Sequence, residues 1–127
     1  MKKTFIFIIV GVFLILTVVF FVLRGNEDNW IKDSRGIWIK HGNPSQTPTM
    51  VLEQQNAINC ALDKFANFTE EINSQCLGVC GNYAVDIVHV PRNAEDNKIE
   101  NQCEEYRNGS VNHFIELGKN GEIVRIL

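Results

Sequence analysis

The longest hydrophobic stretch of the chain runs from Phe5 to Leu23 and is interrupted only by one glycine and one threonine. As a helix, residues 4–23 would be about 30 Å long, which matches the hydrocarbon core of a bilayer. A cleaved signal peptide is the alternative, but its apolar core is typically about 7–15 residues long and ends in small residues. Here the stretch is longer and is followed directly by Arg24. The pattern predicts an uncleaved transmembrane anchor over residues 1–24 that contacts the membrane through residues 4–23.

Residues 25–48 are predicted to form a stalk that contains a β-hairpin and a linker. Two short apolar segments, 30–32 and 37–40, flank Asp33 and Gly36, which suit the first and fourth positions of a turn. A lone two-stranded hairpin is marginally stable in water. We therefore expect it to pack on the following domain or to rest near the membrane surface, where tryptophan is favoured. The rest of this region is rich in Pro, Gly, Asn and Ser, which is typical of a linker.

An amphipathic helix is predicted over residues 49–73, with Thr47 as its cap and Pro48 at its first position. Apolar residues at intervals of three and four form one stripe along it. The members of this stripe are Val51, Ile58, Ala61, Leu62, Phe65, either Phe68 or Thr69, and Ile72. Such a stripe is typical of a helix that covers a core. Asn73, Ser74 and Gly78 provide the signals that end the helix.

The clearest predicted strand is Tyr83–Val90, because it is rich in β-branched residues and is ended by Pro91. Asn93 and the acids that follow it suit the start of a second helix, over about residues 94–107. Its inward face would carry Ile99, Cys103 and Tyr106. Gly109 would close this helix, although Asn108-Gly109 also suits a hairpin turn.

Two more strands, 111–117 and 122–127, are predicted around the turn Gly118–Gly121. The order of elements predicts an α+β fold, because a mixed or antiparallel sheet covered by two helices buries their apolar faces. The chain thus divides into an anchor (1–24), a stalk (25–48) and a small α+β extracytoplasmic domain (49–127).

Charge is distributed unevenly along the 127 residues. The net charge is −3. The first 24 residues carry three basic side chains and no acid, whereas the remainder carries nine basic and fifteen acidic side chains. The C-terminal part therefore has a net charge of −6, which argues against a nucleic-acid partner because gripping a phosphate backbone requires a basic face.

Four cysteines, at positions 60, 76, 80 and 103, favour disulfides over a metal site or free thiols. Their spacing does not provide the paired C-x2-C motifs of zinc sites or the C-x-x-C of thioredoxin-type redox sites. Small domains outside the cell commonly need disulfides. Three pairings are possible. We expect Cys60 to pair with Cys103, at equal depth along two helices, and Cys76 with Cys80, across a short loop. Two disulfides also favour an orientation with the N-terminus inside and the domain outside.

No catalytic, phosphate-binding or metal-binding motif is present in the sequence, so no cofactor or catalytic residue is predicted. Weak binding candidates are His89, His113 and Glu116, which would meet if their strands were antiparallel neighbours and would then form an acid–base pair or a metal site. Histidines that cap the sheet are the simpler interpretation. A group of acids on the second predicted helix is most simply a solvated face. These acids are Glu95, Asp96, Glu100, Glu104 and Glu105.

The segment from Trp30 to Ser45 resembles a short W…GxWxKHGNPS element of small membrane-anchored or secreted proteins from candidate-phylum bacteria and archaea. The likeness covers about 16 residues, and some of those proteins carry a cysteine where this chain has Lys32. It implies a location in the cell envelope and carries over no catalytic residue.

Taken together, these features predict a single-pass cell-membrane protein whose outer domain is a binding or interaction module, with a protein partner in the envelope. One alternative is a membrane-anchored enzyme that uses His89 and His113. The other is a pilin-like surface subunit, although the glycine and glutamate of a prepilin leader are missing around Lys3 to Phe5.

Overall fold

A computed structural model describes residues 2–24, 28–68 and 75–127 of the chain. The fold is α+β, as predicted, and the described residues divide into two compact units. The first unit contains helix α1 (Lys2–Arg24), the base of a hairpin and the segment Ile39–Gln46. Within α1, Phe5–Leu23 has a mean hydropathy of 3.4 and none of its residues is buried. By length and composition it is the one described helix able to cross a membrane.

The predicted hairpin is confirmed as β1 (Asn29–Lys32) and β2 (Trp38–His41). Its turn forms because the Asp33 carboxylate accepts hydrogen bonds from the backbone N–H groups of Arg35 and Ile37, at 2.9 and 3.0 Å. Gly36 takes the positive φ of 86° at which an L side chain would be strained. The tip of the hairpin belongs to the second unit.

The hairpin tip is held by Gln54, a buried glutamine on helix α2 (Thr49–Ala66). Its Oε1 accepts the Trp38 N–H at 2.8 Å, and its Nε2 donates to the Gly36 carbonyl at 2.9 Å. One side chain therefore satisfies two backbone groups of the tip, which explains why a polar residue lies on the buried stripe of α2.

Helix α2 starts where predicted but ends earlier. Pro48, not Thr47, occupies the N-cap, and its carbonyl accepts the N–H of Val51 at 3.0 Å. The helix ends at Ala66, where the side chain of Asn67 bonds back to the carbonyl of Asp63 at 2.8 Å. Residues 69–73 of the predicted helix, including Ile72, and the stop signals Asn73 and Ser74 lie outside the described residues.

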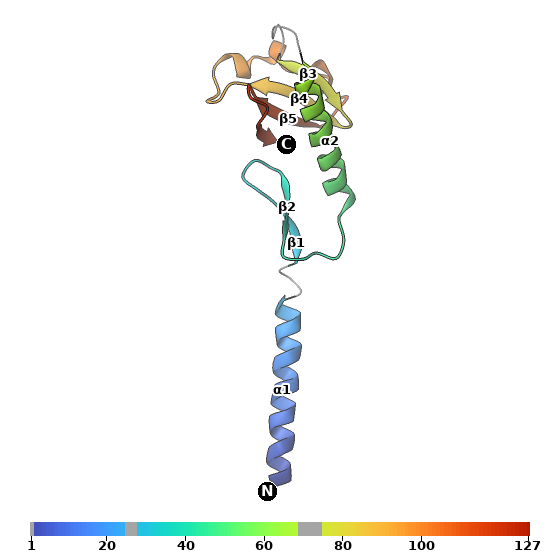
Figure 1. Cartoon of the computed structure of the whole chain (residues 1–127), viewed down its shortest axis with the longest axis vertical. Helices are drawn as coiled ribbons and strands as arrows, with labels where there is room; N and C mark the ends of the chain where they lie inside the picture. The colour runs from blue at the N-terminus through green and yellow to red at the C-terminus, as the bar shows by residue number, and fades with distance from the viewer. Residues whose placement is uncertain (1, 25–27, 69–74) are drawn as a thin grey trace. The chain divides into compact units, whose positions relative to one another are not determined.

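A four-stranded mixed sheet forms the centre of the second unit, in the order β3-β4-β5-β6 (Figure 1). The strands are β3 (Cys76–Cys80), β4 (Tyr83–Val88), β5 (His113–Gly118) and β6 (Ile123–Ile126). The predicted hairpin of β5 and β6 is confirmed, with a hydrogen bond of 2.8 Å from Gly118 N–H to the Glu122 carbonyl. Strands β4 and β5 are parallel, so residues 89–112, called the crossover below, return the chain to the end of the sheet at which β4 begins.

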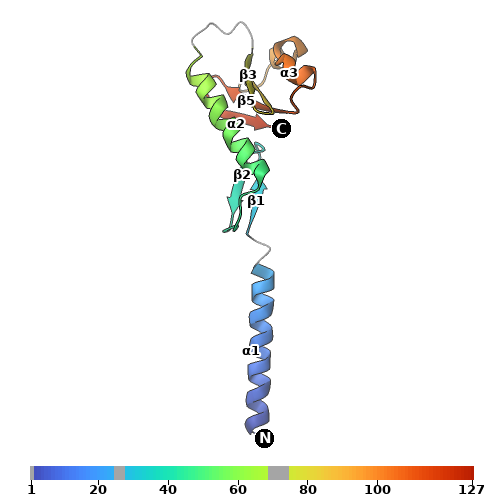
Figure 2. The ribbon, with the colours of Figure 1, turned by 90° about the vertical axis from the view of Figure 1, so that its right-hand side faces the viewer.

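The two faces of the sheet bury different layers (Figure 2). On one face, Val85, Ile115 and Leu117 pack with Ala57 and Ala61 of α2 in the main apolar core. On the other face, Ala84 and Phe114 pack with residues of the crossover in a smaller cluster. Because side chains alternate along a strand, the next positions on this second face, Asp86 and Glu116, also point toward the crossover.

The crossover is not the single helix predicted over residues 94–107. It contains two 3₁₀ turns, η1 (Glu95–Asn97) and η2 (Ile99–Asn101), and one helical turn, α3 (Glu104–Arg107). Lys98 and Gln102 adopt extended backbone angles that break the helix. The physical reason is the burial of the Asp96 carboxylate, around which the chain wraps. Ile99, expected on the inward face, is 66% exposed.

Both disulfides are present, but neither pairing is the predicted one. Cys60 pairs with Cys80 and Cys76 pairs with Cys103. Residues 76–80 form a strand rather than a loop, and residues four apart in a strand lie about 13 Å apart, too far for a disulfide. A bulge between Cys76 and Gly78 turns the two cysteines of β3 to opposite faces of the sheet. One disulfide therefore ties β3 to α2, and the other ties it to the crossover.

Candidate functional site

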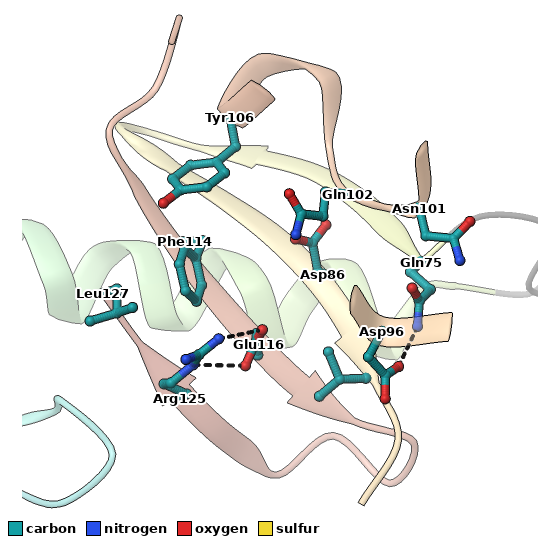
Figure 3. Close-up of a pocket in the computed structure, with 11 residues that line it drawn as sticks. Gln75, Asp86, Asp96, Asn101, Gln102, Tyr106, Phe114, Glu116, Arg125 and Leu127 are labelled. Atoms are coloured by element: carbon teal, nitrogen blue, oxygen red, sulfur yellow. Dashed lines mark hydrogen bonds and ion pairs between the residues drawn. The ribbon is translucent and has the colours of Figure 1, made fainter. Parts of the chain in front are cut away.

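A pocket of about 220 Å³ lies between the second face of the sheet and the crossover (Figure 3). We call it the polar pocket. The sheet supplies Asp86, Val88, Phe114, Glu116 and Arg125. The crossover supplies Asp96, Asn101, Gln102 and Tyr106, and Gln75 and Leu127 complete the lining. Three of these residues are buried carboxylates, each less than 10% exposed. Buried acids are rare unless they are paired, so the partners of each one define the chemistry of the site.

Glu116 is neutralised by two arginines. Arg125, its neighbour across the β5–β6 ladder, donates from Nε and Nη2 at 3.0 Å each. Arg92 of the crossover donates from Nη1 to the same carboxylate, and from Nη2 to the Asp96 carbonyl at 2.8 Å. The two-point pairing fixes the Arg125 guanidinium, which also lies 5.0 Å from the centre of the Phe114 ring. Glu116 therefore joins the sheet to the crossover.

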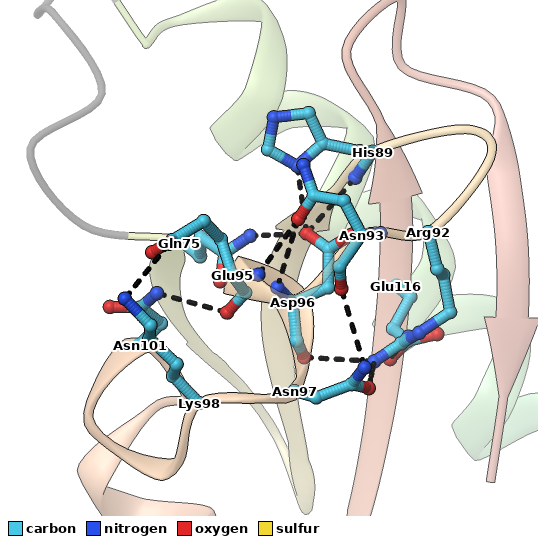
Figure 4. A network of polar contacts seen from close by, with 10 residues as sticks. All are labelled: Gln75, His89, Arg92, Asn93, Glu95, Asp96, Asn97, Lys98, Asn101 and Glu116. Atoms are coloured by element: carbon cyan, nitrogen blue, oxygen red, sulfur yellow. Dashed lines mark hydrogen bonds and ion pairs between the residues drawn. The ribbon is translucent and has the colours of Figure 1, made fainter.

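Asp96 organises the start of the crossover (Figure 4). Its carboxylate accepts the backbone N–H groups of Asn93 at 2.8 Å and His89 at 3.2 Å. It also contacts the His89 Nδ1 at 2.9 Å and accepts a hydrogen bond from the Gln75 amide. Burial alone would raise the pKa of Asp96, but these hydrogen bonds outweigh it and hold the pKa well below its usual range. Asp96 is thus a stable anion with a structural role.

Asp86 differs from the other two carboxylates. In the described part of the chain its side chain accepts one hydrogen bond, from the Cys103 N–H at 3.2 Å, and forms no ion pair. It is 8% exposed and lies beside Glu116 in the parallel ladder. Burial raises the pKa of Asp86 from 3.8 to about 6, and the charge of Glu116 adds to this shift, while Cys103 and Arg92 partly oppose it. The polar pocket therefore contains one incompletely satisfied acid.

The structure does not bring His89 and His113 together. Strands β4 and β5 are parallel, so His113 lies opposite Tyr83, whereas His89 follows the far end of β4. Six residues of strand separate the two positions, which corresponds to about 20 Å. His113 stacks on Tyr83, with ring centres 4.9 Å apart, and lines a second pocket of about 450 Å³ beside the Cys60–Cys80 disulfide. The contact between the histidines required antiparallel neighbours, and the two strands are parallel, so the condition for an acid–base pair or a shared metal site is not met.

Glu116 and His89 contribute to the polar pocket separately: Glu116 lines it, and His89 reaches its edge through Asp96. Of the five acids expected on a solvated helix face, Glu95, Glu100, Glu104 and Glu105 are exposed, whereas Asp96 is buried.

A metal site is not supported at the one cluster with suitable ligand atoms among the described residues. The Sγ atoms of Cys76 and Cys103 and a carboxylate oxygen of Asp86 lie within 4.8 Å of one another. Both sulfurs, however, are bonded to each other in a disulfide and are not thiolate ligands.

Sequence reasoning missed Asp86, Arg92 and Arg125. Asp86 carried the one usable signal, since it is the single carboxylate within the apolar run Tyr83–Val90. Arg92 gave no signal, because its contact with Glu116 depends on the path of the crossover. Arg125 is the cross-strand neighbour of Glu116 in the predicted hairpin, so the register of that hairpin could have pointed to it.

The chain matches no protein-family model, no curated protein and no solved structure at a significant level of similarity. Inferences about its function therefore depend on the geometry of its own residues.

Proposed function

We propose that the protein is a single-pass membrane protein with its N-terminus inside, and that its outer domain is a binding module for a small polar ligand. The apolar helix α1 supports the anchor, and the likeness of the hairpin segment to envelope proteins is in line with it. Two disulfides support an oxidising, extracytoplasmic location for the domain. Lys2 and Lys3 before the apolar stretch favour retention of the short N-terminal tail inside.

The polar pocket is the observation that carries the binding role. Its buried charged groups are held by hydrogen bonds on both walls, so they are positioned before a ligand arrives. Pockets with a few convergent polar groups and a perturbed pKa are the usual sites of ligand binding. The second pocket, beside His113, is larger, but its ionisable Glu53 and His113 are exposed and so are less suited to hold a ligand against water.

An enzyme that uses His89 and His113 together loses its geometric basis, since the two side chains line different parts of the domain. No feature of the described residues favours a pilin-like subunit. The binding module is therefore the proposal that we carry forward, with either a free small molecule or an exposed group of an envelope protein as the ligand.

Orientation is tested with a C-terminal epitope tag on the full chain. We expect an antibody to label intact cells and labelling not to increase after permeabilisation; labelling only after permeabilisation would contradict the proposed topology. The intact mass of the extracted protein decides at the same time whether Met1, Lys2 and Lys3 are retained. Their loss would indicate cleavage and contradict the uncleaved anchor.

Binding is tested by titrating the full chain, in nanodiscs of zwitterionic lipid, with a set of small polar compounds. The backbone amide signal of Cys103 reports on the polar pocket, because this N–H is bonded to Asp86. Shifts of this signal that saturate with concentration would support the binding role. A set of chemically varied compounds that leaves every pocket signal unchanged would contradict it.

A further inference from the structure

Asp86 has more capacity for hydrogen bonds than the described residues use. A carboxylate can accept about four hydrogen bonds, and this one receives a single backbone N–H. Its second oxygen accepts none from the described part of the chain, although the residue is more than nine-tenths buried and lines the polar pocket. Among the described residues no side-chain oxygen is both fully buried and unpartnered, so this second oxygen opens into the polar pocket. A ligand there can complete the coordination of an anion whose burial without a counter-ion is costly.

The charges around Asp86 show which kind of ligand is missing. Of the three carboxylates, Glu116 pairs with the guanidinium groups of Arg92 and Arg125, and Asp96 contacts His89. Asp86 forms no ion pair in the described part of the chain. Glu116 and Asp96 are already satisfied by their own donors. The unbalanced charge therefore resides on Asp86, and a ligand with one positive charge would neutralise it.

A divalent metal ion fits this arrangement poorly. Ca²⁺ takes six to eight oxygen ligands, usually from several carboxylates. Among the described residues that line the pocket, Asp86 alone has free carboxylate capacity, and the two guanidinium groups close to Glu116 repel a doubly charged ion. An ammonium group needs fewer acceptors and carries a single charge, so it matches the site better.

The remaining residues that line the polar pocket suit the part of the ligand that carries the ammonium group. Gln102 also lines the polar pocket, and its amide oxygen is a further hydrogen-bond acceptor there (Figure 3). Val88, Phe114 and Leu127 provide an apolar surface next to the acid. The volume of about 220 Å³ is below that of typical drug-binding pockets, so the ligand group is small.

We propose that the polar pocket binds a primary ammonium group carried on a small, partly apolar body, with Asp86 as its anionic acceptor. A free alkylamine and a lysine side chain share this chemistry. The proposal deepens the binding function above and depends on it, because it names the class of ligand for the same pocket.

Binding of an amine will weaken as Asp86 becomes protonated. Burial raises the pKa of this carboxyl to about 6, whereas an aliphatic amine stays protonated up to about pH 10. The groups that face Asp86 are Glu116 from β5, Arg125 from β6, and Arg92 and Asp96 from the crossover. Both arginines stay charged, and the pKa of Asp96 is held well below its usual range. His89 reaches this site only through Asp96.

The test is a titration of the full chain in zwitterionic nanodiscs with n-butylamine, followed at the Cys103 amide signal. n-Butanol, which is similar in size but neutral, and Ca²⁺ are titrated in parallel. We expect n-butylamine at pH 7.5 to shift the signal in a saturable way, n-butanol to bind at least tenfold more weakly, and Ca²⁺ to leave the signal unchanged. The affinity for n-butylamine should fall about fivefold between pH 6 and pH 5, because the ionised fraction of a carboxyl with a pKa of about 6 falls by that factor.

Variants assign the effect to Asp86. Asp86→Asn should weaken n-butylamine binding at least tenfold and remove its pH dependence, whereas Asp63→Asn, an exposed acid on α2, should change neither. The pH titration of the wild-type chain provides the same information without any substitution. Two lysine methyl esters, both acetylated at the α-amine and one also at the side-chain amine, are titrated in the same way. Tighter binding of the ester with the free side-chain amine than of n-butylamine would identify a lysine side chain as the preferred source, and the reverse order would identify a free alkylamine.

The outcomes separate this proposal from the broader one. Equal binding of n-butanol and n-butylamine, retention of binding in Asp86→Asn, or a shift by Ca²⁺ at the same signal would each overturn the ammonium assignment. If other polar compounds still shifted the pocket signals, the binding function would stand while the ligand class proposed here would be wrong. If no compound shifted them, both proposals would fail.

Discussion

Replacing Asp86 with asparagine should stabilise the protein at neutral pH, although the residue is buried. The carboxylate is 8% exposed and has no ion-pair partner among the described residues, so its charge is a cost in the folded state. Asparagine has nearly the same shape, and its side-chain oxygen can still accept the Cys103 N–H. The substitution therefore removes the charge and keeps the hydrogen bond that the structure shows.

The size of the effect follows from the pKa of Asp86, which burial raises from 3.8 to about 6. A difference of about two units corresponds to about 3 kcal/mol in the free energy of unfolding. Because the pKa of Asp86 is higher in the folded protein than in the unfolded one, the carboxyl does not destabilise the fold below about pH 3.8. The folded state then loses stability as the pH rises, and the loss is complete above about pH 6. Asp86→Asn should thus gain about 3 kcal/mol at pH 7 and less than about 1 kcal/mol at pH 4.

Urea denaturation of the full chain in a zwitterionic detergent, with disulfides intact and near-ultraviolet circular dichroism as the signal, measures this difference. The contributions of other titrating groups largely cancel when the variant is compared with the wild type at each pH. Asp63→Asn on the exposed face of α2 is the control and should change stability by less than about 0.5 kcal/mol. A loss of stability in Asp86→Asn at pH 7, or a gain that does not shrink toward pH 4, would refute the reasoning.

Three further outcomes can be checked with the same preparation. Alkylation without reduction should add no mass, and peptide mapping should join β3 once to α2 and once to the crossover; any free thiol or a link within β3 would contradict the structure. Gly121→Ala should cost about 2–3 kcal/mol in urea denaturation, because φ is +83° and the new methyl group would lie 2.8 Å from the Phe65 ring, whereas Gly109→Ala, with open space around it, should cost about 1 kcal/mol. Gln54→Ala should cost about 2–3 kcal/mol and speed hydrogen exchange at the Trp38 amide, and unchanged exchange there would show that Gln54 does not hold the hairpin tip.

Local signals in the sequence were sufficient for the elements that depend on local chemistry. The apolar stretch of α1, the turn at Asp33 and the hairpin of β5 and β6 follow from residue types at short spacing, and the structure contains all three. Strand β3 was missed because its five residues include two cysteines and a glycine and show no alternation of apolar and polar side chains. The predicted helix over 94–107 is wrong because the hydrogen bonds that hold the buried Asp96, including one from the distant Gln75, outweigh helix propensity.

The site was harder to predict than the fold because it depends on which strands are neighbours and in which direction they run. The same two strand sequences are compatible with parallel or antiparallel pairing. Antiparallel pairing would let His89 meet His113, whereas the parallel pairing observed places Asp86 beside Glu116. The disulfide pairing depends similarly on a bulge in β3, and a bulge of this kind leaves no clear trace in the sequence.

The disulfides and Asp86 act in opposite directions on the stability of the domain. In the chain-entropy model, loops of 20 and 27 residues correspond to about 3–4 kcal/mol of stabilisation for each disulfide. The isolated charge of Asp86 costs about 3 kcal/mol at neutral pH, which is similar in size to one disulfide. The Cys76–Cys103 disulfide also fixes the position of the Cys103 N–H, which donates to Asp86. It therefore keeps this part of the pocket wall in place beside the buried carboxylate. A small domain that is cross-linked beside a carboxylate with no ion-pair partner among the described residues tolerates that cost, and natural proteins commonly retain such costs at functional sites.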